Sequence, residues 1–242
     1  MRRSERRNNL QICPRRDSNT GGSDLLSRTL PLDHGGALIV SKMSGAEAKD
    51  DNSFFMKLTI KSLSSRFPNV KNASTHLVHQ WMYGQDQGEG KESGGDGASA
   101  PAAKEDDPGR VVILDARPPE EYDVSHVVGA IRVHPSAELS DVEKTISLLK
   151  EHEGKQSVVS YCSLGYRGLK YADTLNQQLK KEHPELENNI RVYNLEGGLF
   201  KWANEDKPMV DHKDRPTIYA HPYNTLFGKL LYHHMRREQP EP

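Results

Sequence analysis

The sequence has only two cysteines, Cys13 and Cys162, among its 242 residues. Two cysteines so far apart in the chain exclude a disulfide scaffold and favour a reducing compartment inside the cell. No run of about 18 apolar residues is present, so no segment is expected to span a membrane. Neither sign of charge is in excess, since 33 Lys and Arg stand against 34 Asp and Glu. A general nucleic-acid binder usually carries a basic excess, so that class is disfavoured as well.

Apolar residues are also scarce, with 34% of the chain in the hydrophobic set and a mean hydropathy of −0.78. This composition predicts that part of the chain is disordered, and residues 1–65 are expected to be largely so. The arginine-rich start indicates either a plain disordered tail or a mitochondrial transit peptide. The tail is favoured because Pro14 interrupts the segment, and a cytoplasmic location then follows. Met43 offers a second start of translation, and the sequence leaves that choice open.

A second low-complexity stretch covers residues 84–109, with seven glycines and seven acidic residues. Nothing in it can offset the entropy of ordering, so a flexible acidic insertion is expected. Directly before it, residues 74–82 have the pattern of a helix capped by Ser74 or Thr75.

Regular patterns dominate residues 110–210. Apolar runs predict strands near residues 111–114, 131–133, 157–161 and 190–195, and a short segment near Val70 predicts a fifth. Apolar residues at helical spacing predict helices near residues 139–149, 169–180 and 199–203. This alternation predicts an α/β fold over residues 66–210, with a mainly parallel five-stranded sheet covered by helices on both faces. Residues 211–242 are expected to form a C-terminal extension that packs on the domain as one more helix.

The strand at residues 157–161 is followed by Cys162, a glycine-containing loop and a helix. Ligands of open α/β sheets bind beyond the carboxyl ends of the strands. Loop amides and a helix N-terminus stabilise anions there, and such surroundings lower a thiol pKa from about 8.5 to between ~3.5 and ~7.5. A buried, inert cysteine is the common alternative. The glycine, the arginine and the helix start in one loop favour a reactive thiol.

This loop resembles the active loop of the rhodanese (sulfurtransferase) family, which reads Cys-x-x-Gly-x-Arg. Three further segments resemble the family in the expected order: residues 114–117, residues 120–131, and residues 192–198 followed by Trp202. The resemblance spans about residues 66–210, interrupted by residues 84–109. The sequence departs from the family at Ser125, where Gly is usual, at Val128, where Pro is usual, and at Gly168, where a Ser or Thr hydroxyl is common.

The resemblance implies sulfur transfer from thiosulfate or a persulfide, through a Cys162 persulfide, to a thiol or cyanide acceptor. A protein could also accept the sulfur. No cofactor and no metal are implied. Cys162 would be the nucleophile and the loop amides would hold the persulfide, while the arginine attracts the donor anion and the loop tyrosine shapes the entrance. The implied substrate-binding residues are Ser163, Leu164, Gly165, Tyr166, Arg167 and Gly168.

Several roles stay open at this stage. Asp115 and Arg117 form either a structural pair at a strand end, which is favoured, or a contact to the donor anion. His126 and Glu196 are interpreted as structural residues. Cysteine phosphatases also use a strand, loop and helix, but with five residues between Cys and Arg rather than the four found here. A weakly active or non-catalytic binding or regulatory module is the main alternative to an enzyme.

Overall fold

The structure, a computed structural model, describes residues 46–84 and 107–242, with side chains from Ser53 onward in the first range. The basic leader, Cys13, Met43 and most of the acidic insertion expected at residues 84–109 lie outside the described residues. Among the described residues, no helix is long and apolar enough to cross a membrane.

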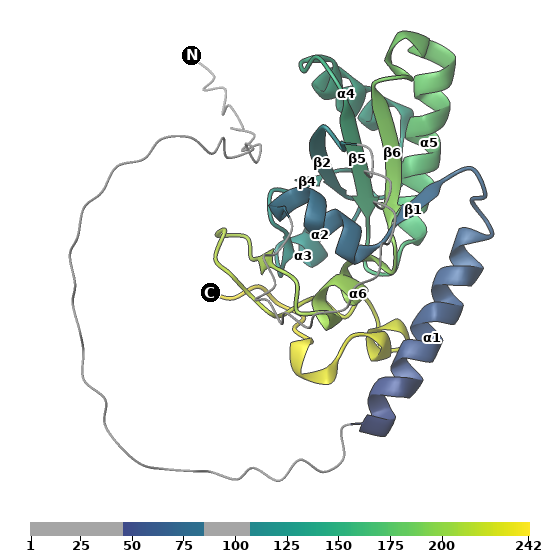
Figure 1. Cartoon of the computed structure of the whole chain (residues 1–242). Coiled ribbons are helices and arrows are strands. Elements are labelled where there is room, and N and C mark those ends of the chain that lie inside the picture. Colours follow the sequence, from purple (N-terminus) through teal and green to yellow (C-terminus); the bar gives the residue numbers. More distant parts are fainter. Residues whose placement is uncertain (1–45, 85–106) are drawn as a thin grey trace, which may run out of the picture.

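A five-stranded parallel sheet forms the centre of the fold (Figure 1). Its strands, in spatial order, are β1 (Lys71–Ala73), β6 (Ile190–Leu195), β5 (Gln156–Tyr161), β2 (Arg110–Asp115) and β4 (Ile131–Arg132). All neighbouring pairs are parallel, as the sequence pattern predicts. The central strand β5 is buried at every position, because helices cover both faces of the sheet.

The two faces carry separate apolar cores. On one face, α4 (Leu139–Lys150) and α5 (Tyr166–Glu182) pack against alternate strand residues such as Val158. On the other face, α2 (Thr75–Tyr83) and α6 (Gly198–Asn204) pack against the next residues along the strands, such as Val159. The α/β architecture with helices on both faces is therefore confirmed. Two short elements also belong to this part of the chain: α3 (Pro119–Tyr122) and the 3-10 turn η1 (Pro184–Leu186).

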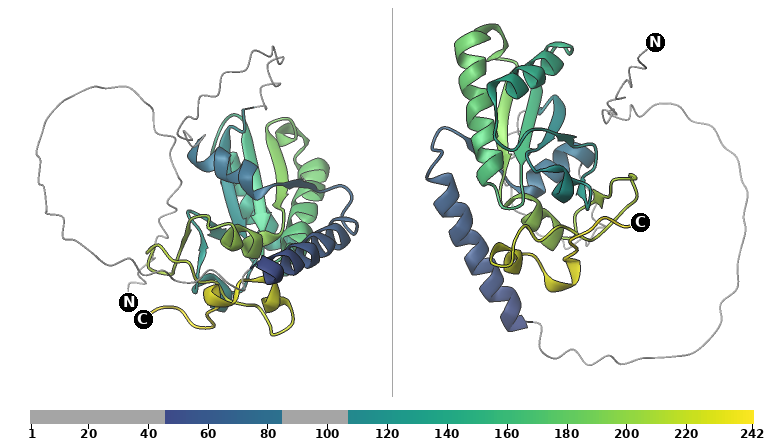
Figure 2. Two further views of the ribbon diagram at one scale, coloured as in Figure 1. Left: turned by 60° about the horizontal axis from the view of Figure 1, so that its bottom comes forward. Right: turned by 180° about the vertical axis from the view of Figure 1, so that it is seen from behind.

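Helix α1 (Ala46–Ser64) is the largest difference from the sequence-based expectation, which left residues 1–65 largely disordered. Its apolar stripe is narrow: Met56, Ile60 and Leu63 recur at helical spacing, and Met56 is buried in the core. The helix therefore depends on tertiary contacts, and its own pattern is weak. Figure 2 shows α1 beside the C-terminal segment, drawn in yellow.

The C-terminal segment, residues 211–242, does pack on the domain, but the expected helix is wrong. All of these residues are described and none is α-helical. The segment follows β7 (Met209–Val210), which pairs antiparallel with β3 (His126–Val127). It then forms two 3-10 turns, η2 (Phe227–Leu230) and η3 (His233–Met235). Pro222 lacks an amide hydrogen and Tyr223 has a positive φ of 64°, so a continuous helix is interrupted there.

The burial of this segment predicts that it stabilises the domain. Leu231 is fully buried while Leu226, five residues earlier, is 68% exposed. Leu231→Ala should lower the free energy of unfolding by about 2–5 kcal/mol, because it removes buried methyl groups and leaves a cavity. Leu226→Ala is the matched control and should change it by less than about 0.5 kcal/mol. Equal effects in urea denaturation would show that the segment is not part of the core.

Candidate active site

Cys162 lies directly after β5, at the carboxyl edge of the sheet, and its loop leads into α5. The side chain is 3% exposed, and the Gly165 amide donates a hydrogen bond to its Sγ at 3.2 Å. Gly165 has a φ of 128°, which a side chain would strain. The first amides of α5 follow immediately, and a helix leaves these groups without partners inside it. Partial positive charge of the backbone therefore lies next to the sulfur.

Backbone hydrogen bonds from the start of α6 hold the Cys162 loop in place. The Leu199 amide donates to the Cys162 carbonyl at 2.9 Å, and the Phe200 amide donates to the Ser163 carbonyl at 3.0 Å. The approach is so close that a Cβ on Gly198 would lie 2.3 Å from the Cys162 carbonyl oxygen. Gly198, the first residue of α6, is thus required by the loop that follows a different element, β5.

The sequence reasoning did not single out Glu121, which is the main partner of the loop. Its carboxylate, on α3, is buried and accepts two hydrogen bonds from Arg167, at 2.7 Å and 2.9 Å. It also accepts a hydrogen bond from Ser163 Oγ, which in turn accepts one from Arg167 at 3.1 Å. The Glu-Glu-Tyr motif was visible in the sequence, but no local signal identified which carboxylate turns inward.

The charges of this cluster support one another. Burial alone would raise the pKa of Glu121, but hydrogen bonds from Arg167 and Ser163 and the charge of Arg167 bring that pKa below its usual value. Burial alone would lower the pKa of Arg167, but the bonds to Glu121 and the charges of Cys162 and Glu121 raise it. Arg167 is therefore a paired cation beside the sulfur, whereas the sequence suggested a cation free to attract a donor.

Aromatic side chains from the loop and from other parts of the chain form a rim beside Arg167. The Tyr223 ring lies 5.0 Å from the Arg167 guanidinium carbon, in cation–π geometry. Tyr166, the loop tyrosine, is half exposed and makes an edge contact with Phe67 at 5.8 Å between ring centroids. Leu63 of α1 packs beside Gly165. The sequence analysis did not foresee that α1 and the C-terminal segment reach this rim.

Asp115 and Arg117 form a fully buried ion pair, with 2.6 Å between Arg117 Nη2 and Asp115 Oδ2. Arg117 also donates to the Ser125 carbonyl at 2.6 Å. This arrangement favours the structural interpretation, because a fully buried guanidinium does not reach a donor in solution. His126 stacks on Tyr122 with 3.9 Å between ring centroids, and burial lowers its pKa, so the ring is neutral at pH 7.

Gly168 has a steric explanation. A Cβ there would lie 2.6 Å from Asn194 Oδ1 and 2.8 Å from the Cα of Tyr161. The first turn of α5 can approach β5 and β6 this closely only without a side chain. The hydroxyl common in the family at this position is therefore excluded by the packing of this chain, and Asn194 Oδ1 stays buried without a hydrogen-bond partner in the described part of the chain.

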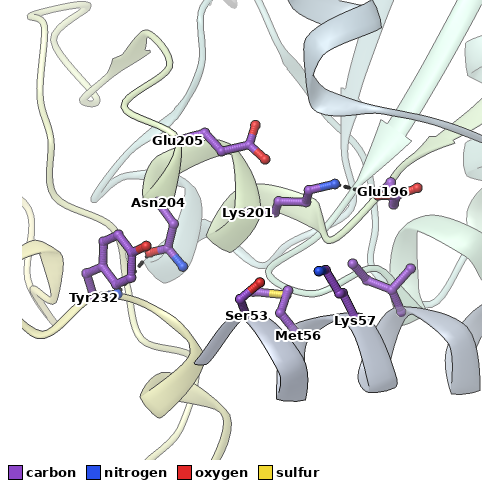
Figure 3. Close-up of a pocket in the computed structure, with 9 residues that line it drawn as sticks. Ser53, Met56, Lys57, Glu196, Lys201, Asn204, Glu205 and Tyr232 are labelled. Atoms are coloured by element: carbon purple, nitrogen blue, oxygen red, sulfur yellow. Dashed lines mark hydrogen bonds and ion pairs between the residues drawn. The ribbon is translucent and has the colours of Figure 1, made fainter. Parts of the chain in front are cut away.

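A separate pocket of about 240 Å³ lies between α1, α6 and the C-terminal segment (Figure 3). Lys57, Glu196, Lys201 and Tyr232 are among its lining residues, and Lys201 is paired with Glu196. Cys162 does not line it. Glu196 has no contact with the sulfur among its described interactions, in line with its interpretation as a turn residue. Within residues 46–84 and 107–242, no group of three or more His, Cys, Asp or Glu side chains could hold a metal ion.

The parallel sheet and the Cys162 loop define the class of this domain. The family model for the rhodanese-like domain matches residues 100–205, which include the whole loop. This part of the chain is a rhodanese-like domain. No curated protein matches the chain.

Three solved structures illustrate the similarity. A thiosulfate sulfurtransferase from Pseudomonas aeruginosa is 17% identical, with 68% of this chain and 23% of that chain covered and a TM-score of 0.41. This chain thus corresponds to 23% of that protein's length. A possible tyrosine phosphatase from Rhodopseudomonas palustris CGA009 is 16% identical, covering 71% of this chain and 98% of that chain, with a TM-score of 0.40. A yeast protein tyrosine phosphatase of the rhodanese family is 20% identical, covering 56% and 85%, with a TM-score of 0.40.

The close approach at Gly168 predicts the effect of a methyl group there. Gly168→Ala would gain about 1 kcal/mol from helix propensity. The clash with the Tyr161 backbone in the central strand costs more, about 1–3 kcal/mol, because that backbone cannot move aside. We expect a lower melting temperature, measured by circular dichroism. Lys170→Ala, on the exposed face of the same helix, is the control, and a Gly168→Ala protein more stable than wild type would contradict the steric explanation.

The Glu121 pair predicts a pH-dependent contribution to stability. Glu121→Gln should cost roughly 2–3 kcal/mol at pH 7, because it leaves Arg167 without its counter-charge. The folded-state pKa of Glu121 is lowered, so its contribution is present above the unfolded value of about 4.3 and is lost as the pH falls through the folded value. The difference between wild type and Glu121→Gln in urea denaturation should therefore shrink at acidic pH. A difference that stays constant would exclude the ion pair as its cause.

Proposed function

We propose that this domain is a sulfurtransferase that carries a sulfane sulfur on Cys162. The observation that carries the proposal is the position of Sγ, which accepts a hydrogen bond from the Gly165 amide at the N-terminus of α5, with Arg167 beside it. The Cys162 thiolate is the nucleophile of this reaction, and the Gly165 amide and Arg167 are its neighbours.

The reaction balances in two steps. The Cys162 thiolate attacks the outer sulfur of a donor, the bond between that sulfur and the rest of the donor breaks, and its electron pair leaves with the donor residue. A Cys162 persulfide remains, and its terminal sulfur anion extends toward the amides of the loop. A thiol or cyanide acceptor then attacks that sulfur and regenerates the Cys162 thiolate. No cofactor takes part in either step, and a protein thiol could serve as acceptor.

The four-residue spacing between Cys162 and Arg167 supports a single transferred sulfur atom over a phosphoryl group. The longer five-residue loop of cysteine phosphatases encloses a tetrahedral phosphate with more amides. In this chain the arginine is also engaged by Glu121 at 2.7 Å. A phosphoryl group would have to compete with that carboxylate for the same guanidinium.

Sulfur transfer is tested with the purified full chain in a cyanide-coupled assay. Wild type should release thiocyanate from a sulfane donor, and Cys162→Ser should reduce the rate to the background without protein, because serine cannot carry the sulfur. Mass spectrometry of wild type after donor alone should show a gain of one sulfur atom on Cys162. Identical thiocyanate release by the two proteins would exclude the enzymatic function. Hydrolysis of para-nitrophenyl phosphate by wild type and not by Cys162→Ser would instead indicate a phosphatase.

A further inference from the structure

The cation beside Cys162 is already paired with a carboxylate. Arg167 is the cation beside Cys162, and the Glu121 carboxylate binds both of its terminal nitrogens. Arg117, which follows the neighbouring strand β2, is also paired, with Asp115. The thiolate therefore adds a negative charge to surroundings in which Arg167 and Arg117 already have carboxylate partners.

The wall of the mouth is aromatic. Tyr223 lies over the face of Arg167 at 5.0 Å, and its ring centroid is 6.2 Å from that of Phe227. Tyr166 stands at the start of α5, next to the same arginine, and contacts Phe67. Tyr166, Tyr223 and Phe227 are all substantially exposed. Exposed rings beside a reactive sulfur offer apolar surface to the non-reacting part of a substrate.

The backbone at Tyr223 has an uncommon conformation. Its φ of 64° is in the left-handed region, which a tyrosine rarely adopts. The Tyr223 amide donates to His221 Nδ1 at 3.1 Å, and the chain then enters the Asn224 turn, where Asn224 accepts from the Gly228 amide at 2.8 Å. Such a conformation persists only where the surrounding structure imposes it.

We propose that the Cys162 site is selective for organic sulfane donors with one negative charge and an apolar carbon group, of the thiosulfonate or organic persulfide type, over the thiosulfate dianion. This inference rests on the proposed sulfur transfer and names its donor class. A singly charged donor meets less repulsion from the thiolate than thiosulfate does, because Glu121 neutralises Arg167. The carbon group of the donor contacts Tyr223 and Tyr166 while its outer sulfur reaches Cys162.

The step is balanced for a thiosulfonate, R–SO2–S⁻. The Cys162 thiolate forms a bond to the terminal sulfur, the bond between that sulfur and the sulfonyl sulfur breaks, and the sulfinate R–SO2⁻ leaves with the electron pair. The total charge is −2 on both sides. With thiosulfate the same step starts from a total charge of −3, so two like charges must be brought to the thiolate instead of one.

The test of the ring contact compares benzenethiosulfonate with methanethiosulfonate, which share the reacting group and the charge. In the cyanide-coupled assay, wild type should have a kcat/KM about tenfold higher for benzenethiosulfonate. Tyr223→Ala should reduce this ratio at least about threefold, and Tyr223→Phe should restore it, because the ring is retained. Tyr219→Ala is the matched control, since Tyr219 stacks on Arg237 at 3.7 Å in the same segment and should leave the ratio unchanged. A Tyr223→Ala ratio equal to that of wild type overturns the ring contact.

The test of the charge compares thiosulfate with methanethiosulfonate as the ionic strength is raised. If Arg167 is neutralised, added salt should raise kcat/KM for thiosulfate relative to methanethiosulfonate, because salt screens repulsion from the thiolate. Glu121→Gln frees the charge of Arg167 and should raise the relative kcat/KM for thiosulfate about tenfold. A fall of the thiosulfate value with salt in wild type would show that a free cation attracts it, and would overturn the proposal even if the Glu121 variant does not fold.

The outcomes separate this inference from the proposed function. If none of the donors gives thiocyanate above the Cys162→Ser background, sulfur transfer itself fails. If all three donors react and thiosulfate has the highest kcat/KM with no response to Tyr223→Ala, the domain is a sulfurtransferase and only the donor class is wrong.

Discussion

The ion pair between Glu121 and Arg167 is the interaction on which the rest of the site depends. It joins α3 to the first turn of α5 and brings Ser163 into the same cluster. Both side chains are largely removed from water. Either charge alone would be destabilising there, because a buried ion without a partner loses its hydration and gains nothing in return. Their mutual neutralisation has a chemical consequence as well. In the proposed reaction, Arg167 therefore presents little net charge to the donor anion, because Glu121 is its counter-charge.

The Cys162 loop is supported from several sides by parts of the chain that are far apart in sequence. Backbone amides of α6 donate hydrogen bonds to the loop carbonyls. The amide of Gly165, the residue that caps α5, donates to the sulfur of Cys162. The buried pair of Asp115 and Arg117 holds the end of the neighbouring strand. The outer wall comes from α1 and the C-terminal segment, both outside the residues 100–205 that match the rhodanese-like family. The loop, which lies within the residues that match the family, is thus combined with a rim formed by residues outside that match.

Particular elements show which features the sequence could predict. Strands β2, β5 and β6 were predicted because each is a short apolar run, and the loop after β5 was predicted from three residues at fixed spacing. Helix α1 was missed because only Met56, Ile60 and Leu63 mark its buried side, so its stability comes from the domain on which it packs. The prediction of a C-terminal helix was wrong. It was based on the spacing of apolar residues, but Pro222 and the turn at Tyr223 interrupt a helix there.

The sequence by itself determined the parallel sheet, the end of β5 at which Cys162 stands and the helix whose amides follow it. These features depend on local periodicity and on one short motif, which neighbouring residues carry. Only the tertiary structure decided which carboxylate pairs with Arg167, since Glu121 is 46 positions away. It also decided that Tyr223 covers that arginine and that Gly168 leaves no room for a hydroxyl. Such contacts join residues that are neighbours only after the chain has folded, so no local pattern along the sequence records them.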